Sequence, residues 1–175
     1  MTKAASATNE ETISVLNDLV STCVDGVEGF RTATDAVKNN EAKVLFQSRV
    51  RVIETSEVEL KAAVRRLGGD PAKHGHAVGS LRRVWVNIKS AATGKNEEAI
   101  LAEVIRGEEG AVEHYRDALK KALPQDVRAV VEKQFRGAEE NLDRVRNLAK
   151  SARTASRGAS ESSTAPRSTD VRPKL

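Results

Sequence analysis

The chain has 175 residues, of which 31% are charged and only 3% are aromatic. That length suffices for one ordinary domain with a tail, and so few aromatic residues imply a core of aliphatic side chains, which suits packed helices. Much of the net charge of +4 lies in residues 152–175, so the rest of the chain is nearly neutral and gives no reason to expect a nucleic acid partner.

The first predicted helix follows a short polar segment. Thr8 and Glu11 form a capping-box pattern, in which the hydroxyl accepts from the amide of Glu11 and the carboxylate reaches back. Downstream, mostly apolar residues recur at intervals of three and four, which is the periodicity of one helical face. They are Ile13, Leu16, Val20, Cys23, Val27, Phe30, Thr34 and Val37. Lys38 suits the end of this helix, and Asn39-Asn40 is expected to form the turn.

The second predicted helix spans residues 41–67 and also carries one stripe with this spacing. Its members are Phe46, Val50, Ile53, Glu57, Leu60, Val64 and Leu67. One of them, Glu57, is a carboxylate in an otherwise apolar series. Gly68-Gly69-Asp70-Pro71 is expected to end the helix sharply. Because the turn before this helix is short, the first two helices should be antiparallel neighbours.

Residues 70–96 form a longer connection between the second and third helices. It begins as a loop, and residues 80–94 predict a short extra helix with Leu81, Val84, Trp85 and Ile88 on one face. A connection of this length lets the chain cross the bundle, so the third helix need not lie antiparallel to the second.

The third predicted helix spans residues 97–123, with Asn96 as its cap. Its apolar positions are Leu101, Ile105, Val112, Tyr115 and Leu119. Glu108 falls on the same face, where a carboxylate has to be paired, protonated or bound to something. Pro124 is tolerated in the first turn of a fourth helix. That helix carries Val127, Val131, Gln134, Ala138, Leu142, Val145, Leu148 and Ala149 on one stripe.

After Arg153 the apolar periodicity ends, and the remaining residues are mostly Ser, Thr, Pro, Arg and Ala. Such a segment buries too little apolar surface to order itself. We therefore expect a four-helix bundle over residues 8–153 and a disordered basic tail over residues 154–175.

Cellular location is constrained by the single cysteine, Cys23, which rules out an intramolecular disulfide and fits a reducing compartment. The N-terminus shows no apolar segment typical of a signal peptide. No apolar run of about 18 residues predicts a membrane span. We expect a cytoplasmic protein without a membrane partner.

The polar residues on the apolar stripes can be placed by height in the bundle. Counting from the two hairpin turns at about 1.5 Å per residue, Cys23 and Glu57 lie at one level, and Glu108 and Gln134 lie within roughly one turn of each other. Tyr115 lies two turns from Glu108 on the same face, so its hydroxyl can reach a carboxylate. We predict a polar layer of Cys23, Glu57, Glu108, Gln134 and Tyr115.

Several segments carry a resemblance to a known family: TISVLNDLVSTCVDGVEGFR, VRRLGGDPAKHG, GEEGAVEHYRDAL and LPQDVRAVVEKQ. Together with the two hairpins, the crossover and the mid-bundle carboxylates, they resemble a bacterial ferritin-like four-helix-bundle family of unknown function. That family is distantly similar to rubrerythrins and bacterioferritins. The resemblance implies an all-α, ferritin-like fold.

The same resemblance identifies candidate metal ligands. Di-iron members of the fold use Glu on two helices and Glu-x-x-His on the other two. The matching residues are Glu54, Glu57 and Glu108, whereas no His follows three residues after the candidate positions on the second and fourth helices. We expect no bound cofactor, with iron or another divalent metal as the alternative.

The sequence is consistent with three alternative functions. The leading one is a non-catalytic accessory or stress-type interaction protein, whose surface or homodimer interface does the work. The second is a degenerate di-metal carboxylate protein that binds iron, manganese or zinc. The third is a nucleic-acid-associated protein, with weak electrostatic binding through residues 153–175. The sequence favours a protein that is not an enzyme.

Overall fold

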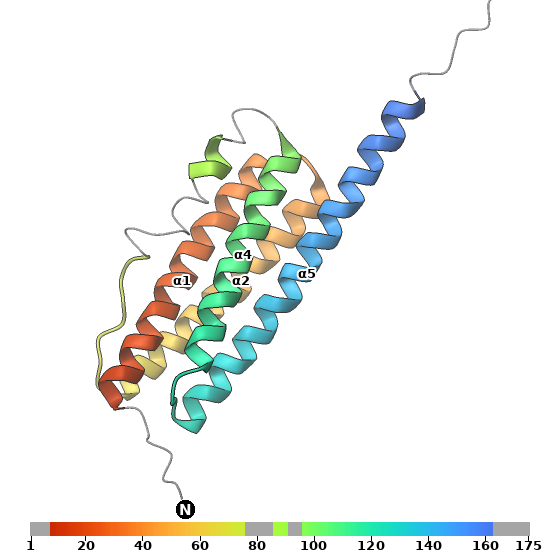
Figure 1. The fold of residues 1–175 in the computed structure, drawn as a ribbon. Coiled ribbons are helices and arrows are strands. Elements are labelled where there is room, and N and C mark those ends of the chain that lie inside the picture. Colours follow the sequence, from red (N-terminus) through yellow and green to blue (C-terminus); the bar gives the residue numbers. More distant parts are fainter. Residues whose placement is uncertain (1–7, 76–85, 91–95, 163–175) are drawn as a thin grey trace, which may run out of the picture.

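A computed structural model describes residues 8–75, 86–90 and 96–162 of the chain. These residues form four long helices packed as a bundle, as the sequence predicts (Figure 1). The helices are α1 (Asn9–Ala36), α2 (Asn40–Arg66), α4 (Glu97–Leu119) and α5 (Gln125–Ser162). Residues 86–90 are also helical, which confirms a short helix in the connection; the rest of its predicted extent lies outside the described residues. None of the described helices is long and apolar enough to cross a membrane.

The helices form two hairpins, α1–α2 and α4–α5, which pack side by side. α1 contacts α2 and α4, and α5 contacts α4 and α2. In the described part of the chain, α2 and α4 have no close backbone contacts, so they occupy opposite corners of the bundle. α2 ends beside the start of α1, where Asn17 binds Asp70 and Ala72, whereas α4 begins at the opposite end, where Glu97 binds the amide of Asn39. The connection therefore leads from one end of the bundle to the other and places α4 beside α1 and parallel to α2 (Figure 1).

Local hydrogen bonds fix the helix starts where the sequence predicts them. Glu11 N–H donates to Thr8 Oγ1 at 3.2 Å, and Thr8 N–H donates to Glu11 Oε2 at 3.0 Å, which confirms the capping box. Asn96 caps α4 by accepting from the amide of Ala99 at 3.1 Å. Asn39, predicted only as part of a turn, caps α2 in the same way.

The end of α2 requires a glycine. Gly68 has a φ of 85°, in the left-handed region that side chains with a Cβ rarely adopt. Its N–H donates to the carbonyl of Arg65, and the N–H of Gly69 donates to the carbonyl of Val64, both at 3.0 Å. This is the Schellman arrangement, which satisfies two carbonyls at the end of the helix.

Two helix ends differ from the predicted boundaries. α4 ends at Leu119 rather than at residue 123, because the Arg128 side chain binds the carbonyls of Leu119 and Lys121 in place of the missing helical amides. α5 continues past Arg153 to Ser162 and extends beyond the bundle (Figure 1). Adding residues to an existing helix costs far less than nucleating one, so helix can persist without apolar contacts. The remaining predicted tail, residues 163–175, lies outside the described residues.

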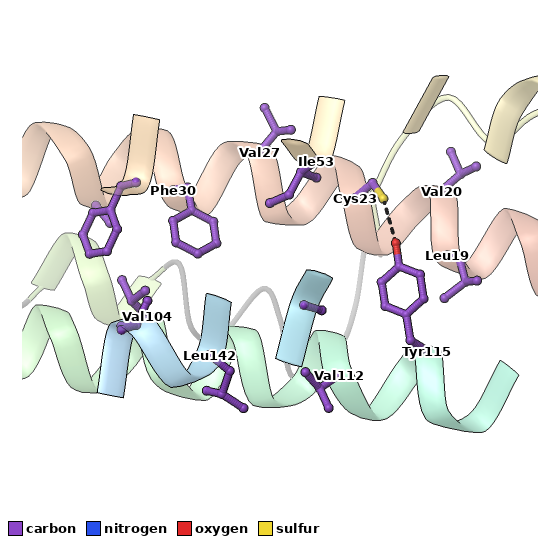
Figure 2. Close-up of a cluster of buried hydrophobic side chains, with 14 of the residues drawn as sticks. Leu19, Val20, Cys23, Val27, Phe30, Ile53, Val104, Val112, Tyr115 and Leu142 are labelled. Atoms are coloured by element: carbon purple, nitrogen blue, oxygen red, sulfur yellow. Dashed lines mark hydrogen bonds between the residues drawn. The ribbon is translucent and has the colours of Figure 1, made fainter. Parts of the chain in front are cut away.

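The core is aliphatic, with a few aromatic rings, and contains side chains from all four long helices (Figure 2). Phe30 and Phe46 meet edge to face with their ring centroids 5.5 Å apart. Ile88, from the connection, is only 1% exposed and belongs to the same core. The predicted stripe of α1 is buried at most of its positions.

Candidate functional site

A small cavity lies in the middle of the bundle. Glycines and alanine contribute to its wall, namely Gly26, Gly29, Gly107 and Ala111. Because these residues are small, they leave space between the helices. The centres of water molecules can occupy about 50 Å³ of the cavity. This volume holds a few waters at roughly 10–15 Å³ each. Its polar lining includes Cys23, Arg49, Glu108, Tyr115 and Gln134.

One wall of the cavity is an ion pair between Arg49 of α2 and Glu108 of α4. Arg49 Nε lies 2.9 Å from Glu108 Oε1, and Arg49 Nη2 lies 3.0 Å from Glu108 Oε2. The two side chains are 8% and 2% exposed. Two parallel N–H···O bonds of this kind match the planar guanidinium to the carboxylate, which is the strong form of a charged pair.

Arg49 is absent from the apolar stripe predicted for the second helix. Phe46, Arg49, Ile53, Ser56 and Leu60 follow a three-four spacing as well as the predicted series does. Arginine is seldom buried, so the sequence favours the series that contains Val50. A buried glutamate on the facing helix was the available signal, because such a carboxylate needs a cation.

The charge on Glu108 depends on its partner. Burial raises the pKa of Glu108, and this effect outweighs the opposing influence of the Arg49 charge and hydrogen bonds and of Asn141. A guanidinium keeps its charge in proteins, so protonating the Glu108 carboxyl would leave a buried cation without its counterion. The pair therefore works as a unit.

A second polar group joins Cys23, Tyr115 and Gln134. Tyr115 Oη donates to Gln134 Oε1 at 3.0 Å and lies 3.5 Å from Cys23 Sγ (Figure 2). Since the phenol proton is used on Gln134, the thiol has to donate to the phenol oxygen. Burial raises the pKa of Cys23 to about 11 and that of Tyr115 well above its ordinary value. Both groups therefore stay neutral near pH 7.

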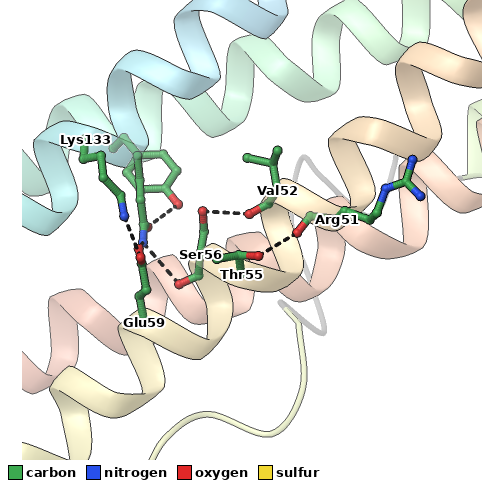
Figure 3. A network of polar contacts seen from close by, with 8 residues as sticks. Arg51, Val52, Thr55, Ser56, Glu59 and Lys133 are labelled. Carbon is green, nitrogen blue, oxygen red and sulfur yellow. Dashed lines mark hydrogen bonds and ion pairs between the residues drawn. The ribbon is translucent and has the colours of Figure 1, made fainter.

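Gln134 continues this group outward to the surface. Its Nε2 donates to the carbonyl of Ser56 at 3.2 Å and to Glu59 Oε2 at 2.9 Å. Lys133 Nζ binds the other oxygen of Glu59 at 2.5 Å (Figure 3). The hydrogen bonds from Lys133 and then Gln134 lower the pKa of Glu59. The buried Cys23 thiol is thus linked to the surface ion pair of Glu59 and Lys133 through two side chains, Tyr115 and Gln134.

The predicted polar layer is divided between these two groups. Cys23, Tyr115 and Gln134 form one hydrogen-bonded chain, and Glu108 lines the same cavity but binds Arg49. Glu57 is not among the described residues that line this cavity. It is 20% exposed at its side chain and pairs with Lys61 at 2.5 Å, one turn along α2.

The candidate metal ligands do not converge. Glu54 binds Arg31 at 2.6 Å on the surface, Glu57 binds Lys61, and Glu108 binds Arg49. Within the described residues, no group of three or more His, Cys, Asp or Glu side chains is placed to hold a metal ion. Each carboxylate is already matched by a cation, so this donor set does not fit a di-metal centre.

Comparison with known proteins places the fold within a family. The family described as domain of unknown function (DUF2383) matches residues 11–121. The chain belongs to the DUF2383 family. That match covers most of α1 and all of α2 and α4, and it therefore includes both partners of the buried ion pair. No curated protein matches the sequence of this DUF2383 chain.

Two solved structures are similar to this DUF2383 protein in fold. One is a two-domain protein from Anabaena variabilis with DJ-1/ThiJ/PfpI-like and ferritin-like domains, at 12% identity and a TM-score of 0.65. The match covers 98% of this chain and 42% of that protein, so the chain spans less than half of its length. The other is a mutant of Mycobacterium smegmatis Dps1, at 14% identity and a TM-score of 0.65 over 81% of this chain and 97% of that one. Both identify the fold as ferritin-like.

Proposed function

We propose that this DUF2383 protein is a non-catalytic interaction protein, in which the centre of the ferritin-like bundle stabilises the fold and the outer surface binds a partner. The observation that carries the proposal is the Arg49–Glu108 pair. Glu108 is the candidate ligand of α4, and both of its oxygens are taken by one guanidinium.

A metal ion at this position would face two obstacles. It would have to displace Arg49 from Glu108, which would leave a buried guanidinium without a counterion. It would also approach that guanidinium closely, where two like charges repel strongly because the surroundings are apolar. The pair therefore disfavours the binding of any divalent cation in the cavity.

The other donors near the cavity are poor ligands for a hard cation. Cys23 keeps its proton up to a pKa of about 11, whereas a metal binds the thiolate. Gln134 offers a neutral amide whose oxygen already accepts from Tyr115. The centre thus supplies hydrogen bonds and a matched ion pair instead of open ligand positions.

Metal loading tests this proposal. The protein, produced without a purification tag, is incubated with Fe(II) without oxygen, desalted and measured by elemental analysis. We expect far less than one iron per chain and no rapid oxygen consumption after mixing with air. Mn(II) and Zn(II) are loaded in the same way.

The variant Arg49→Ala gives a matched comparison, because it frees both oxygens of Glu108. Arg31→Ala, which frees the surface carboxylate Glu54, serves as its control. Any gain in metal should be confined to Arg49→Ala. Two metal ions per chain in the unmodified protein would overturn the proposal and favour a di-metal carboxylate protein.

A further inference from the structure

The outer side of α2 exposes apolar side chains that the bundle does not cover. Val44, Val52 and Val58 are 66%, 48% and 67% exposed, and they are three of the four large hydrophobic residues exposed in the described part of the chain. Scattered exposed valines are ordinary, but these three lie on one helix within 15 residues. This concentration marks α2 as a candidate contact surface.

The exposed side of α2 has the spacing of a helix-packing seam. Ser48, Val52, Thr55, Glu59 and Ala62 follow one another at intervals of four and three, as in a helix that packs against another helix. Arg51 and Val58 flank this series. We call these seven residues the α2 outer face.

The hydroxyl group of Thr55, at the centre of this face, is already satisfied. Its Oγ1 donates to the carbonyl of Arg51 at 3.0 Å (Figure 3). This donor needs no water, so covering it costs little desolvation. What a partner meets in the middle of the face is mostly methyl groups.

We propose that the α2 outer face packs antiparallel against the same face of a second copy of this chain, with Thr55 on the two-fold axis. In this register Val52 faces Val58 of the second copy, and Ser48 faces Ala62. Arg51 faces Glu59 of the second copy, so opposite charges meet on both sides of the axis. A parallel pair would instead bring each Arg51 against its own copy.

The ends of α2 agree with the antiparallel arrangement. Its first turn carries Glu41, and its last turn carries Arg65 and Arg66. Antiparallel packing brings the acidic start of each helix near the basic end of the other, and it also opposes the two helix dipoles favourably. The inference rests on the proposed function and deepens it by naming the partner; its tests measure association and are independent of metal loading.

The mass in solution is the first test. Sedimentation velocity over a range of micromolar concentrations should show a dimer for the full chain. Val52→Asp and Val58→Asp should each weaken the dimer by about tenfold or more, because a carboxylate would be buried without a partner. Val86→Asp is the matched control, since Val86 is 60% exposed but lies outside α2. It should leave the dimer intact, and circular dichroism checks that all three variants fold.

Cysteine cross-linking tests the register. Thr55→Cys should form a disulfide between copies on mild oxidation, because residues on the axis meet their own counterparts within disulfide reach. Ser48→Cys is the control on the same face; in this register its copies lie about 21 Å apart along the helices and should not cross-link. The native Cys23 is buried and does not compete. A monomer at all concentrations, or a dimer that neither valine variant weakens and Thr55→Cys does not cross-link, would overturn the proposal.

Discussion

Arg49 and Glu108 bind each other across the diagonal of the bundle, although their helices have no close backbone contact in the described part of the chain. Only long side chains can bridge such opposite corners. The pair therefore spans the core from α2 to α4 and crosses between the two hairpins. No other buried ion pair is found between the described residues of these helices.

The first prediction concerns this pair. Arg49→Met should lower the free energy of unfolding by about 3–5 kcal/mol, because it leaves the Glu108 carboxyl buried without its cation. The double variant Arg49→Met with Glu108→Leu should recover most of that loss, since an apolar pair needs no charge compensation. Urea unfolding of the two single variants and the double variant measures the coupling. Losses that simply add would show that the two residues do not act as a unit.

Glu57, a carboxylate on α2 outside the buried ion pair, provides the control for that experiment. Glu57 is partly exposed and pairs with Lys61 on its own helix, so Glu57→Gln should change the free energy of unfolding by roughly 0.5 kcal/mol or less. It should also show no coupling with Glu108→Leu. A strong coupling would mean that the two carboxylates share a layer after all.

The second prediction concerns the reactivity of Cys23. Its pKa is raised from 9.0 to about 11 by burial, so the folded protein should not react with a thiol reagent at pH 8. Between about pH 9 and 11 the unfolded chain loses this proton while the folded chain keeps it, so stability should fall as the pH rises through that window. Fast reaction of the thiol in the absence of denaturant would contradict the burial of this residue.

The third prediction concerns acid stability. Lys133 and Gln134 lower the pKa of Glu59 below its ordinary value of 4.5, so the ionised carboxylate stabilises the fold above that pH. The contribution is lost as the pH falls through the lowered value. In Glu59→Gln the loss of stability between neutral and acidic pH should be shallower than in the unmodified protein. If the stability of both proteins falls equally steeply with decreasing pH, Glu59 does not contribute to acid unfolding.

The fourth prediction concerns the end of α2. Gly68→Ala should cost about 1–2 kcal/mol, because a Cβ disfavours the left-handed backbone at this residue. Nothing lies within 4 Å of the added Cβ, so the loss reflects backbone conformation and not a clash. Gly68→Asn should cost less than Gly68→Ala, since asparagine tolerates this region better. Thermal or urea unfolding distinguishes the two, and equal losses would point to another cause.

Local chemistry explains why much of the fold could be predicted from sequence. The capping box at Thr8, the cap at Asn96 and the stop at Gly68 each depend on residues a few positions apart. Apolar periodicity located the four helices for the same reason. The end of α4 was misplaced because it depends on Arg128, which lies on the next helix.

The candidate site was less accessible to sequence reasoning. Counting residues from the turns brought Cys23 and Gln134 to one region, since height in a bundle follows from helical rise. Tyr115 was placed by its spacing from Glu108, and its hydroxyl binds the Gln134 amide and the Cys23 thiol instead of the predicted carboxylate. Choosing between Val50 and Arg49 for the buried stripe required knowledge of what stood opposite on α4. Periodicity is equally satisfied by both series, and only the partner Glu108 decides between them.

The diagonal ion pair also bears on how the two hairpins find their alignment. Aliphatic side chains recur every turn along each helix, so sliding one hairpin by a turn past the other would still bury valines and leucines. That slide would separate Arg49 from Glu108 and leave two isolated charges in the core, at a cost far above that of a few mismatched methyl groups. We infer that the pair selects one docked alignment of the hairpins out of several with similar hydrophobic burial, even where its net contribution to stability is small.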